Sequence, residues 1–466
     1  MQLSHIRPVS AAVFDDPKLV SCAGLVPMAA LAQQCGLARL ADEHLSVPTD
    51  KGAHAGAKVS CLVAGMVAGA DSIDDMALLR HGAMGTVFDR PYAPSTLGSF
   101  LREFAFGHVR QLDAVASCLL VGLASDTPVA AGIDGPVCVD VDDTIIEVHG
   151  YAKQGSGYGY SGVRGLNALI ATVTTAGGAP VITGQRLRNG SCGSPRGAAR
   201  MIGDTLATVK RLRSPQATTK PLVRMDSAFY GYPSVAAAIR GDPRWCRRVG
   251  HRASGPQGQS RYRRHRRGRL DGDRLHRRHL RRHHRSVISR AEVAEIGSPH
   301  SAPAKPPSRS TAGLVVRRIP DLNPTTNGQA TLFDTWRFHA FFTTTDSDTV
   351  SADKIHRGHA IIEQVHADLK DSALAYLPVG AIRRQRRLAG PGRHRVQLTP
   401  AAATLTGPAM GKARTATIRR TLISVPARIA PSARRLRLHL PRGWPWETAW
   451  NTLFDSLFRR NQPIIA

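Results

Sequence analysis

The 466-residue sequence has few cysteines, few aromatic residues and no long apolar run. Its seven cysteines include no C-x-x-C pair, and their odd number argues against a disulfide framework and a zinc ribbon. No apolar run reaches the roughly 18 residues of a membrane span, and the first residues lack the regions of a secretory signal. We therefore expect a soluble, cytoplasmic protein.

Acidic residues are scarce as well. Asp and Glu total 34 against 63 Lys and Arg, so the formal net charge is +29. An excess of this size favours polyanionic partners, above all nucleic acid. The hydrophobic content of 42% and a length sufficient for about three average domains indicate a globular protein with a sizeable core.

Two different periods divide the chain. Up to about residue 130, apolar residues recur at steps of three and four, which predicts a helical region. Its segment APSTLGSFLREF leaves two interpretations open, a DNA-binding helix-turn-helix and a helical bundle without a ligand. From Val137 onward the period is two, and strands, a glycine-rich stretch (Gly150–Gly165), a helix and a further strand follow one another. This order predicts an α/β sheet.

An arginine-rich segment interrupts that pattern. Between Arg244 and Arg285 there are sixteen arginines and six histidines, against only Asp271 and Asp273, and no lysine occurs from residue 221 to residue 304. One interpretation is a basic arm that binds phosphates. The other, which we favour, is an out-of-frame reading of a GC-rich gene. Residues 297–310 and 381–397 have a similar composition, and residues 312–346 between them have β patterning.

Acidic residues at three places are candidates for chemistry. Asp140, Asp142 and Asp143 end a buried strand, Asp226 closes a second strand, and Glu363 lies on a predicted helix. A carboxylate on an apolar strand is costly unless it is paired or binds a cation. Carboxylates from two strand ends and one helix are suited to two Mg²⁺ or Mn²⁺ ions that promote phosphodiester chemistry.

The predicted helix 353–370 carries a polar stripe at helical spacing: His356, His359, Glu363, His366 and Lys370. Such a stripe is often only a solvated helix face. A zinc site formed by the three histidines is a further alternative, although the spacing is not H-E-x-x-H and no cysteine lies near.

Three segments together resemble a known family. VDVDDTIIEVHG, VRMDSAFYG and HRGHAIIEQVHADLK are similar to the signature blocks of bacterial insertion-sequence DDE transposases. The resemblance covers about residues 14 to 450, and it is to the branch with a β-rich insertion between the second aspartate and the glutamate. It implies an α/β fold with a ribonuclease-H-like mixed sheet, flanking helices and an N-terminal helical domain.

The resemblance assigns roles residue by residue. The family's Asp-x-Thr places the first catalytic and metal-binding aspartate on Asp142, with Asp140 and Asp143 as alternates. The second aspartate is Asp226, and the third acid is Glu363.

The same resemblance implies DNA contacts on the helix of the third block. Lys370 matches the family's lysine, whose position implies contact with a phosphate. His356 and His359 stand where the family has Tyr and Arg, and Arg357 is nearby but offset. We predict DNA binding by these four residues, and the departure from the family pattern affects positioning of the DNA end more than metal binding.

The implied domain organisation combines this core with basic regions. The predicted parts are 1–130, helical and DNA-binding; 131–241, first part of the catalytic core; 242–350, the insertion, with 242–286 and 297–310 disordered or out of frame; 351–400, second part of the core; and 401–466, a basic C-terminal region.

The implied function is Mg²⁺-dependent cleavage and strand transfer at the ends of an insertion sequence. Its partners would be terminal inverted repeats and target DNA, bound by a homodimer associated with the nucleoid. Two alternatives remain: a catalytically dead, frameshifted remnant that at most binds DNA, and a ribonuclease-H-like nuclease or resolvase without transposition.

Overall fold

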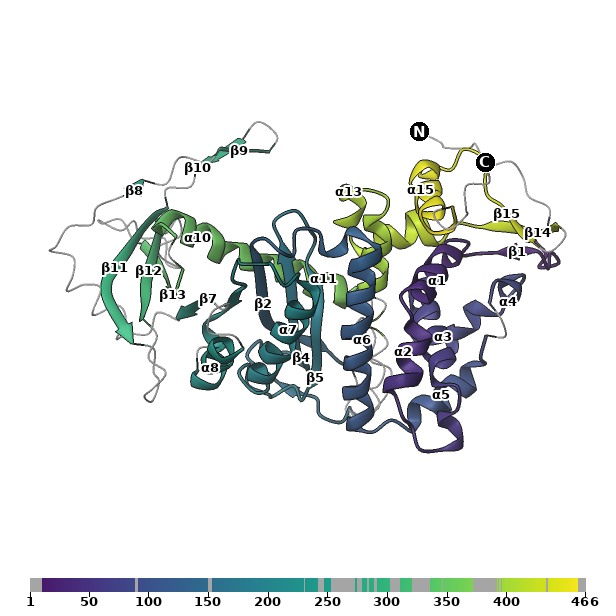
Figure 1. Ribbon diagram of the computed structural model, residues 1–466, viewed down its shortest axis with the longest axis horizontal. Helices are drawn as coiled ribbons and strands as arrows, with labels where there is room; N and C mark the ends of the chain where they lie inside the picture. Colours follow the sequence, from purple (N-terminus) through teal and green to yellow (C-terminus); the bar gives the residue numbers. More distant parts are fainter. Residues whose placement is uncertain are drawn as a thin grey trace.

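A mixed β-sheet fills the middle of the molecule, with a helical region at one end and a group of antiparallel strands at the other (Figure 1). The computed structural model describes residues 11–88, 91–149, 153–229, 231–241, 247–252, 273–274, 279–282, 285–288, 291–301, 311–320, 336–345, 347–371, 392, 394, 396–432 and 435–459. Burial of apolar side chains determines how the helical region and the sheet are arranged.

The N-terminal region is helical, as the apolar spacing predicts. Side chains such as Leu31, Leu62 and Phe100 are fully buried in a shared core, because apolar residues three and four positions apart lie on one face of each helix. The helices are α1 (Leu25–Gln34), α2 (Leu37–His44), α3 (Ala55–Ala68), α4 (Met84–Val87), α5 (Pro94–Arg102) and α6 (Phe106–Asp126).

Helices α5 and α6 correspond to the segment for which a helix-turn-helix was predicted. The two helices meet at 112° and are joined by residues 103–105, and helix-turn-helix motifs have angles of roughly 90–120°. α6 also packs against α2, α7 and β5, which a plain helical bundle explains equally well. The DNA-binding interpretation therefore stays a prediction.

None of the described helices is by itself long and apolar enough to cross a bilayer, and α5 and α6 meet the length and composition requirement only as a bent pair.

The C-terminal elements share the core of the N-terminal helices (Figure 1). Ala402, Leu422 and Leu453 are fully buried among the side chains of that region. Strand β1 (Leu19–Val20) pairs with β14 (Ala427–Ser432), which pairs with β15 (Arg435–His439). The remaining elements are α13 (Pro408–Gly411), α14 (Thr415–Ile418), the π-helical turn η6 (Arg419–Ile423) and α15 (Glu447–Phe458). The two ends of the chain thus form one helical region.

The central sheet has the mixed topology that the sequence predicts. β2 (Val137–Glu147) is antiparallel to β4 (Arg164–Thr175) and parallel to β6 (Leu222–Met225), which is parallel to β7 (Arg247–Arg252). β3 (Gly157–Tyr158) and β5 (Val181–Arg188) pair with β4. Helices α7 (Ala198–Leu212) and α8 (Tyr232–Arg240) connect β5 to β6 and β6 to β7. Parallel neighbours need such crossover helices, so the α/β prediction is confirmed.

The predicted insertion extends the same sheet. β7 pairs with β13 (Trp336–Thr343), followed by β12 (Thr311–Pro320), β11 (Glu292–Ser301) and β8 (Asp273–Arg274). β9 (His279–Arg282) and β10 (Arg285–Ile288) form a separate hairpin. The β patterning predicted for residues 312–346 corresponds in the described residues to β12 and β13. Most of 253–286, together with 302–310 and 381–391, lies outside the described residues, so the proposed frame change there stays a prediction.

The two faces of the central sheet are covered by different helices. On one face, Val139 and Val141 pack with Met201 and Ile202 of α7. On the other, Ile146 packs with Val365 of α11 (Ile361–Lys370). Helix α10 (Thr349–Arg357) and the 3₁₀ turn η5 (Gly358–Ala360) lead into α11. The helix with the predicted glutamate therefore covers one face of the strand with the predicted aspartates.

Candidate active site

The three aspartates of β2 lie on opposite faces of the sheet. Successive side chains of a strand alternate between faces. Asp140 and Asp142 share the face of Ile146, which α11 covers, and Asp143 shares the face of Val141, which α7 covers. The cluster that is contiguous in sequence is thus divided in space.

Asp140 is fully occupied by neighbouring side chains. Its carboxylate is 0% exposed and accepts two hydrogen bonds from Arg224 on β6, at 2.7 Å each. His359 Nδ1 lies 2.7 Å from Asp140 Oδ1. A buried carboxylate with these partners is a structural ion pair, with little capacity left to bind a metal ion.

Asp143 is occupied in the same way on the opposite face. It accepts a hydrogen bond of 2.7 Å from Arg188 Nη2 and a second one from the amide of Asn167. All three side chains are buried. Of the three candidates on β2, Asp142 is the one whose carboxylate is not paired with a buried arginine.

Asp142 and Asp226 lie side by side, although the prediction that the aspartates end the first strand is wrong: β2 continues to Glu147, so Asp142 lies in its middle, whereas Asp226 directly follows the end of β6. β2 and β6 are parallel and Val141 pairs with Met225, so Asp142 and Asp226 are the next residues of both strands. Burial, with smaller contributions from the nearby Asp226 and Asp143, raises the pKa of Asp142 to about 7 against the lowering effects of the Asp143 N–H and of His359. Burial also raises the pKa of Asp226, with a smaller effect of Asp143 in the same direction.

The backbone donates to both of these carboxylates. The N–H of Asp143 donates to Asp142 Oδ1 at 2.8 Å, and the N–H of Ala228 donates to Asp226 Oδ1 at 3.0 Å. In the described part of the chain neither acid forms a hydrogen bond or ion pair with Lys or Arg. Two adjacent, half-buried carboxylates without a Lys or Arg partner among the described residues are a donor set that fits Mg²⁺ or Mn²⁺.

Glu363 lies on α11, the helix that covers this face of the sheet, but its side chain does not converge with those of Asp142 and Asp226. It lies in the first turn of α11 with an exposed side chain. One turn later, His366 Nδ1 lies 3.9 Å from Asp142 Oδ2. Within the described ranges, no three His, Cys, Asp or Glu side chains are arranged to hold a metal ion.

The three histidines of the zinc alternative do not converge. His356 stacks on Phe341 with ring centroids 4.2 Å apart, and His359 contacts Asp140. Burial lowers the pKa of His366 to about 4, with Lys370 and His359 acting in the same direction. His366 is therefore neutral at neutral pH, and its contact with Asp142 is not an ion pair.

The other predicted DNA contacts are nearer the surface. Lys370 is exposed at the last turn of α11. Arg357 pairs with the buried Asp353 at 2.8 Å, and its own side chain is 38% exposed.

The part of the chain that contains these acids matches a known protein family. The family model described as the transposase DDE domain matches residues 134–387, a range that includes β2, β6 and α11. The chain belongs to this family. No curated protein matches the sequence. Transposases of the family act on DNA as polynucleotidyl transferases and typically use divalent metal ions.

Arg224 lies beside the candidate acids of the transposase and was not predicted from the sequence. Besides holding Asp140, its Nη1 donates to the carbonyl oxygen of Ile355 at 2.6 Å, which ties the end of α10 to β6. The signal was present in PLVRMD, since a charged side chain on an apolar strand needs a buried partner. Its partner, 84 positions earlier, was not evident from local pattern.

Gly358 provides a test of how closely this arginine is packed. A Cβ at Gly358 would lie 2.6 Å from Arg224 Nη1. Because that nitrogen is fixed by Ile355, we expect Gly358→Ala to destabilise the transposase by about 1–3 kcal/mol, measured by urea unfolding. The control is Gly203→Ala in α7, where a Cβ meets nothing within 4 Å and a stabilising effect is expected. Equal unfolding midpoints for the parent and Gly358→Ala would contradict this packing.

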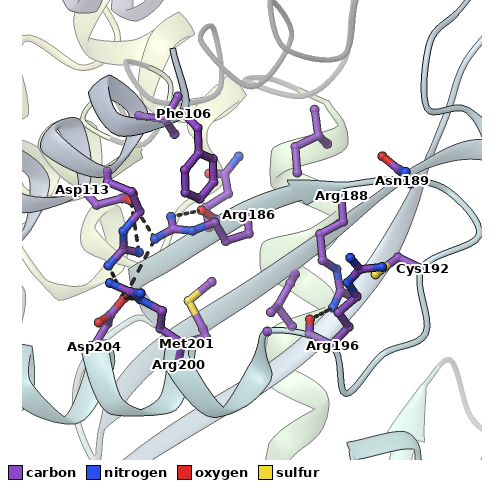
Figure 2. A pocket seen from close by; sticks show the side chains of 16 residues that line it. Phe106, Asp113, Arg186, Arg188, Asn189, Cys192, Arg196, Arg200, Met201 and Asp204 are labelled. Carbon is purple, nitrogen blue, oxygen red and sulfur yellow. Dashed lines mark hydrogen bonds and ion pairs between the residues drawn. The ribbon is translucent and has the colours of Figure 1, made fainter. Parts of the chain in front are cut away.

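A cavity of about 390 Å³ lies on the opposite face of the transposase sheet, between α6, β5 and α7 (Figure 2). Arg186 Nη2 lies 2.6 Å from Asp113 Oδ2, and Arg110 Nη2 lies 3.0 Å from Asp204 Oδ2. Arg110 and Asp113 come from α6, whereas Arg186 and Asp204 come from β5 and α7. These ion pairs join the N-terminal helices to the sheet on the face away from Asp142.

Proposed function

We propose that this transposase cleaves the ends of an insertion sequence and transfers them to target DNA, with Asp142, Asp226 and Glu363 as its catalytic acids. The observation that carries the proposal is the pair Asp142–Asp226, half-buried and adjacent on parallel strands within the matched family domain. Two Mg²⁺ or Mn²⁺ ions held by the acids would activate the attacking hydroxyl and stabilise the leaving oxygen.

The flanking arginines support Asp142 as the metal ligand. Arg224 and Arg188 neutralise Asp140 and Asp143, so both neighbours are held in place and the charge of Asp142 remains available. A site whose ligands are fixed by their surroundings binds a cation with less loss of conformational entropy. Glu363 stands on the helix that covers this face, one turn before a residue that approaches Asp142.

DNA binding beside these acids is proposed for the exposed cations. Lys370 and the partly exposed Arg357 are available for phosphate contacts, while His356 and His359 are engaged by Phe341 and Asp140. The net charge of +29 supports DNA as the partner. We further propose that two copies act on paired DNA ends.

Cleavage of the element's own ends tests the proposal. The purified protein with Mg²⁺ is expected to cut linear DNA carrying those ends, and EDTA is expected to stop cleavage. Asp226→Asn is expected to reduce the rate at least about 100-fold, because it removes one metal-binding carboxylate. Asp15→Asn, which changes an exposed N-terminal carboxylate, is the control with unchanged rate. Cleavage that persists in EDTA or in Asp226→Asn would refute the assignment.

A second candidate is a DNA-binding remnant without catalysis. Two observations favour it: the arginine-rich, lysine-free composition of residues 244–285, and the position of Glu363 outside any three-acid metal group of the described residues. Salt-sensitive binding to the ends without cleavage under any divalent ion would support this candidate over the first.

A further inference from the structure

The glycine-rich stretch between β2 and β4 presents two exposed tyrosines that the proposed chemistry does not use. Tyr158 and Tyr160 are 68% and 74% exposed. An aromatic ring left in water forgoes the large contact area that such side chains usually bury. Exposed aromatic rings beside a reaction site are therefore candidates for contact with the substrate.

The hydroxyl of Tyr160 is anchored beside the acids. It donates to the carbonyl oxygen of Asp143 at 3.4 Å, and Asp143 directly follows Asp142 on β2. Partial burial of the hydroxyl raises the pKa of Tyr160, and the nearby Asp143, Asp142 and Asp226 raise it further. The oxygen end of the side chain thus lies near the acids, while most of the ring faces solvent.

The backbone before Tyr160 is packed against the sheet. A Cβ at Gly159 would lie 2.9 Å from both the carbonyl oxygen of Gly190 and Cδ1 of Ile145. The N–H of Gly190 also donates to the carbonyl oxygen of Gly155 at 2.9 Å. The loop therefore holds its exposed ring in a defined position, which reduces the entropy lost when a ligand binds.

We propose that the ring of Tyr160 is a stacking surface for a nucleobase of the DNA end next to the scissile phosphate. This inference rests on the proposed function. A phosphate held beside Asp142 and Asp226 through a divalent ion would bring the bases of its flanking nucleotides close to the neighbouring loop. Every base has a π-face, so an exposed aromatic ring positions a strand without reading its sequence. The hydrogen bond from the Tyr160 hydroxyl to the carbonyl oxygen of Asp143 would fix the stacked base relative to β2, the strand that carries Asp142.

Photocrosslinking and affinity measurements test the proposal on the full-length protein. DNA ends carry 5-iodouracil at the nucleotides that flank the cleavage site, and binding is measured with Ca²⁺ in place of Mg²⁺, so that an ion can still join the acids to the phosphate while the DNA stays intact. We expect crosslinking to Tyr160, identified by mass spectrometry. Tyr160→Ala should lose this crosslink and weaken end binding by about 10-fold to 100-fold, the range for removal of one stacked aromatic.

Two further variants separate stacking from other roles. Tyr160→Phe keeps the ring and should retain the crosslink and most of the affinity. Tyr158→Ala removes an equally exposed ring from the same loop and should bind like the parent. Parental affinity in Tyr160→Ala, or an equal loss in Tyr158→Ala, would overturn the inference while cleavage by the parent still supports the proposed function. Failure of the parent to bind or cleave the ends would overturn both.

Discussion

The Asp142→Asn variant is expected to lose at least about 1000-fold of its DNA cleavage rate and yet to be more stable than the parent in metal-free buffer at pH 8. The loss of activity follows from removing a metal-binding carboxylate, a change worth about 4 kcal/mol of barrier at this factor. The gain in stability follows from burial, which raises the pKa of Asp142 to about 7. The same carboxylate is thus expected to be costly for folding and required for chemistry.

The pH dependence of this effect has a definite sign. In the unfolded chain the carboxyl ionises near its ordinary pKa of 3.8, whereas in the folded protein it holds its proton up to about pH 7. The folded state therefore binds more protons between these values, and stability falls as pH rises through that window. The full separation corresponds to ~4 kcal/mol. Because the Asp142 side chain is 20% exposed, we expect a cost of about 2 kcal/mol above pH 7.

Urea unfolding of parent and variant at pH 4 and pH 8 in EDTA measures this cost. The two proteins should be nearly equal at pH 4, and Asp142→Asn should unfold at higher urea at pH 8. Asp15→Asn, on the exposed N-terminal segment, should follow the parent at both values. Added Mg²⁺ should stabilise the parent more than Asp142→Asn, because an ion that binds only the folded state raises its stability. A variant less stable than the parent at pH 8 would contradict the uncompensated charge.

The pairing of Asp142 with Asp226 was accessible from the sequence. Each acid follows a run of apolar strand residues, and an α/β order of elements predicts that two such strands are parallel neighbours. The structure differs in that β2 continues past Asp142 to Glu147. Among the aspartates of β2, Asp142 was predicted by the family's Asp-x-Thr pattern, but the physical reason that favours it was not accessible. It depends on Arg224 and Arg188, which lie 84 and 45 positions from their partners, and local patterning has no information on contacts at that separation.

For the fold as well, elements with a local sequence pattern were predicted, whereas contacts between distant parts of the chain were not. Strand and helix periods predicted the N-terminal helices, the central sheet and β12 and β13 of the insertion. The union of residues 401–458 with the N-terminal helices was missed, because the apolar residues around Leu422 and Leu453 predict burial without identifying the surface that covers them. Tyr160 was missed for a related reason, since a glycine-rich loop has no period from which the direction of a side chain follows.

Arg224→Met is expected to destabilise the protein by about 3–5 kcal/mol, the usual cost of removing one partner from a buried ion pair. Arg224 and Asp140 are 4% and 0% exposed, and the two hydrogen bonds between them are 2.7 Å long. Without the guanidinium, Asp140 would keep His359 as its one side-chain partner among the described residues, and the carbonyl of Ile355 would lose the Arg224 donor. The free energy of unfolding in urea measures the loss.

A double-mutant cycle distinguishes a net stabilising pair from one that is merely costly to break. Replacing both charges, in Asp140→Leu with Arg224→Met, removes the unpaired buried charge and should recover most of the stability lost by either single variant. Cleavage should not recover with it, because the link from Arg224 to Ile355 positions the segment that leads into α11 and Glu363. Recovery of both stability and cleavage would show that the pair serves only the fold. A single variant that costs less than about 1 kcal/mol would show that the two charges are not buried as the structure describes them.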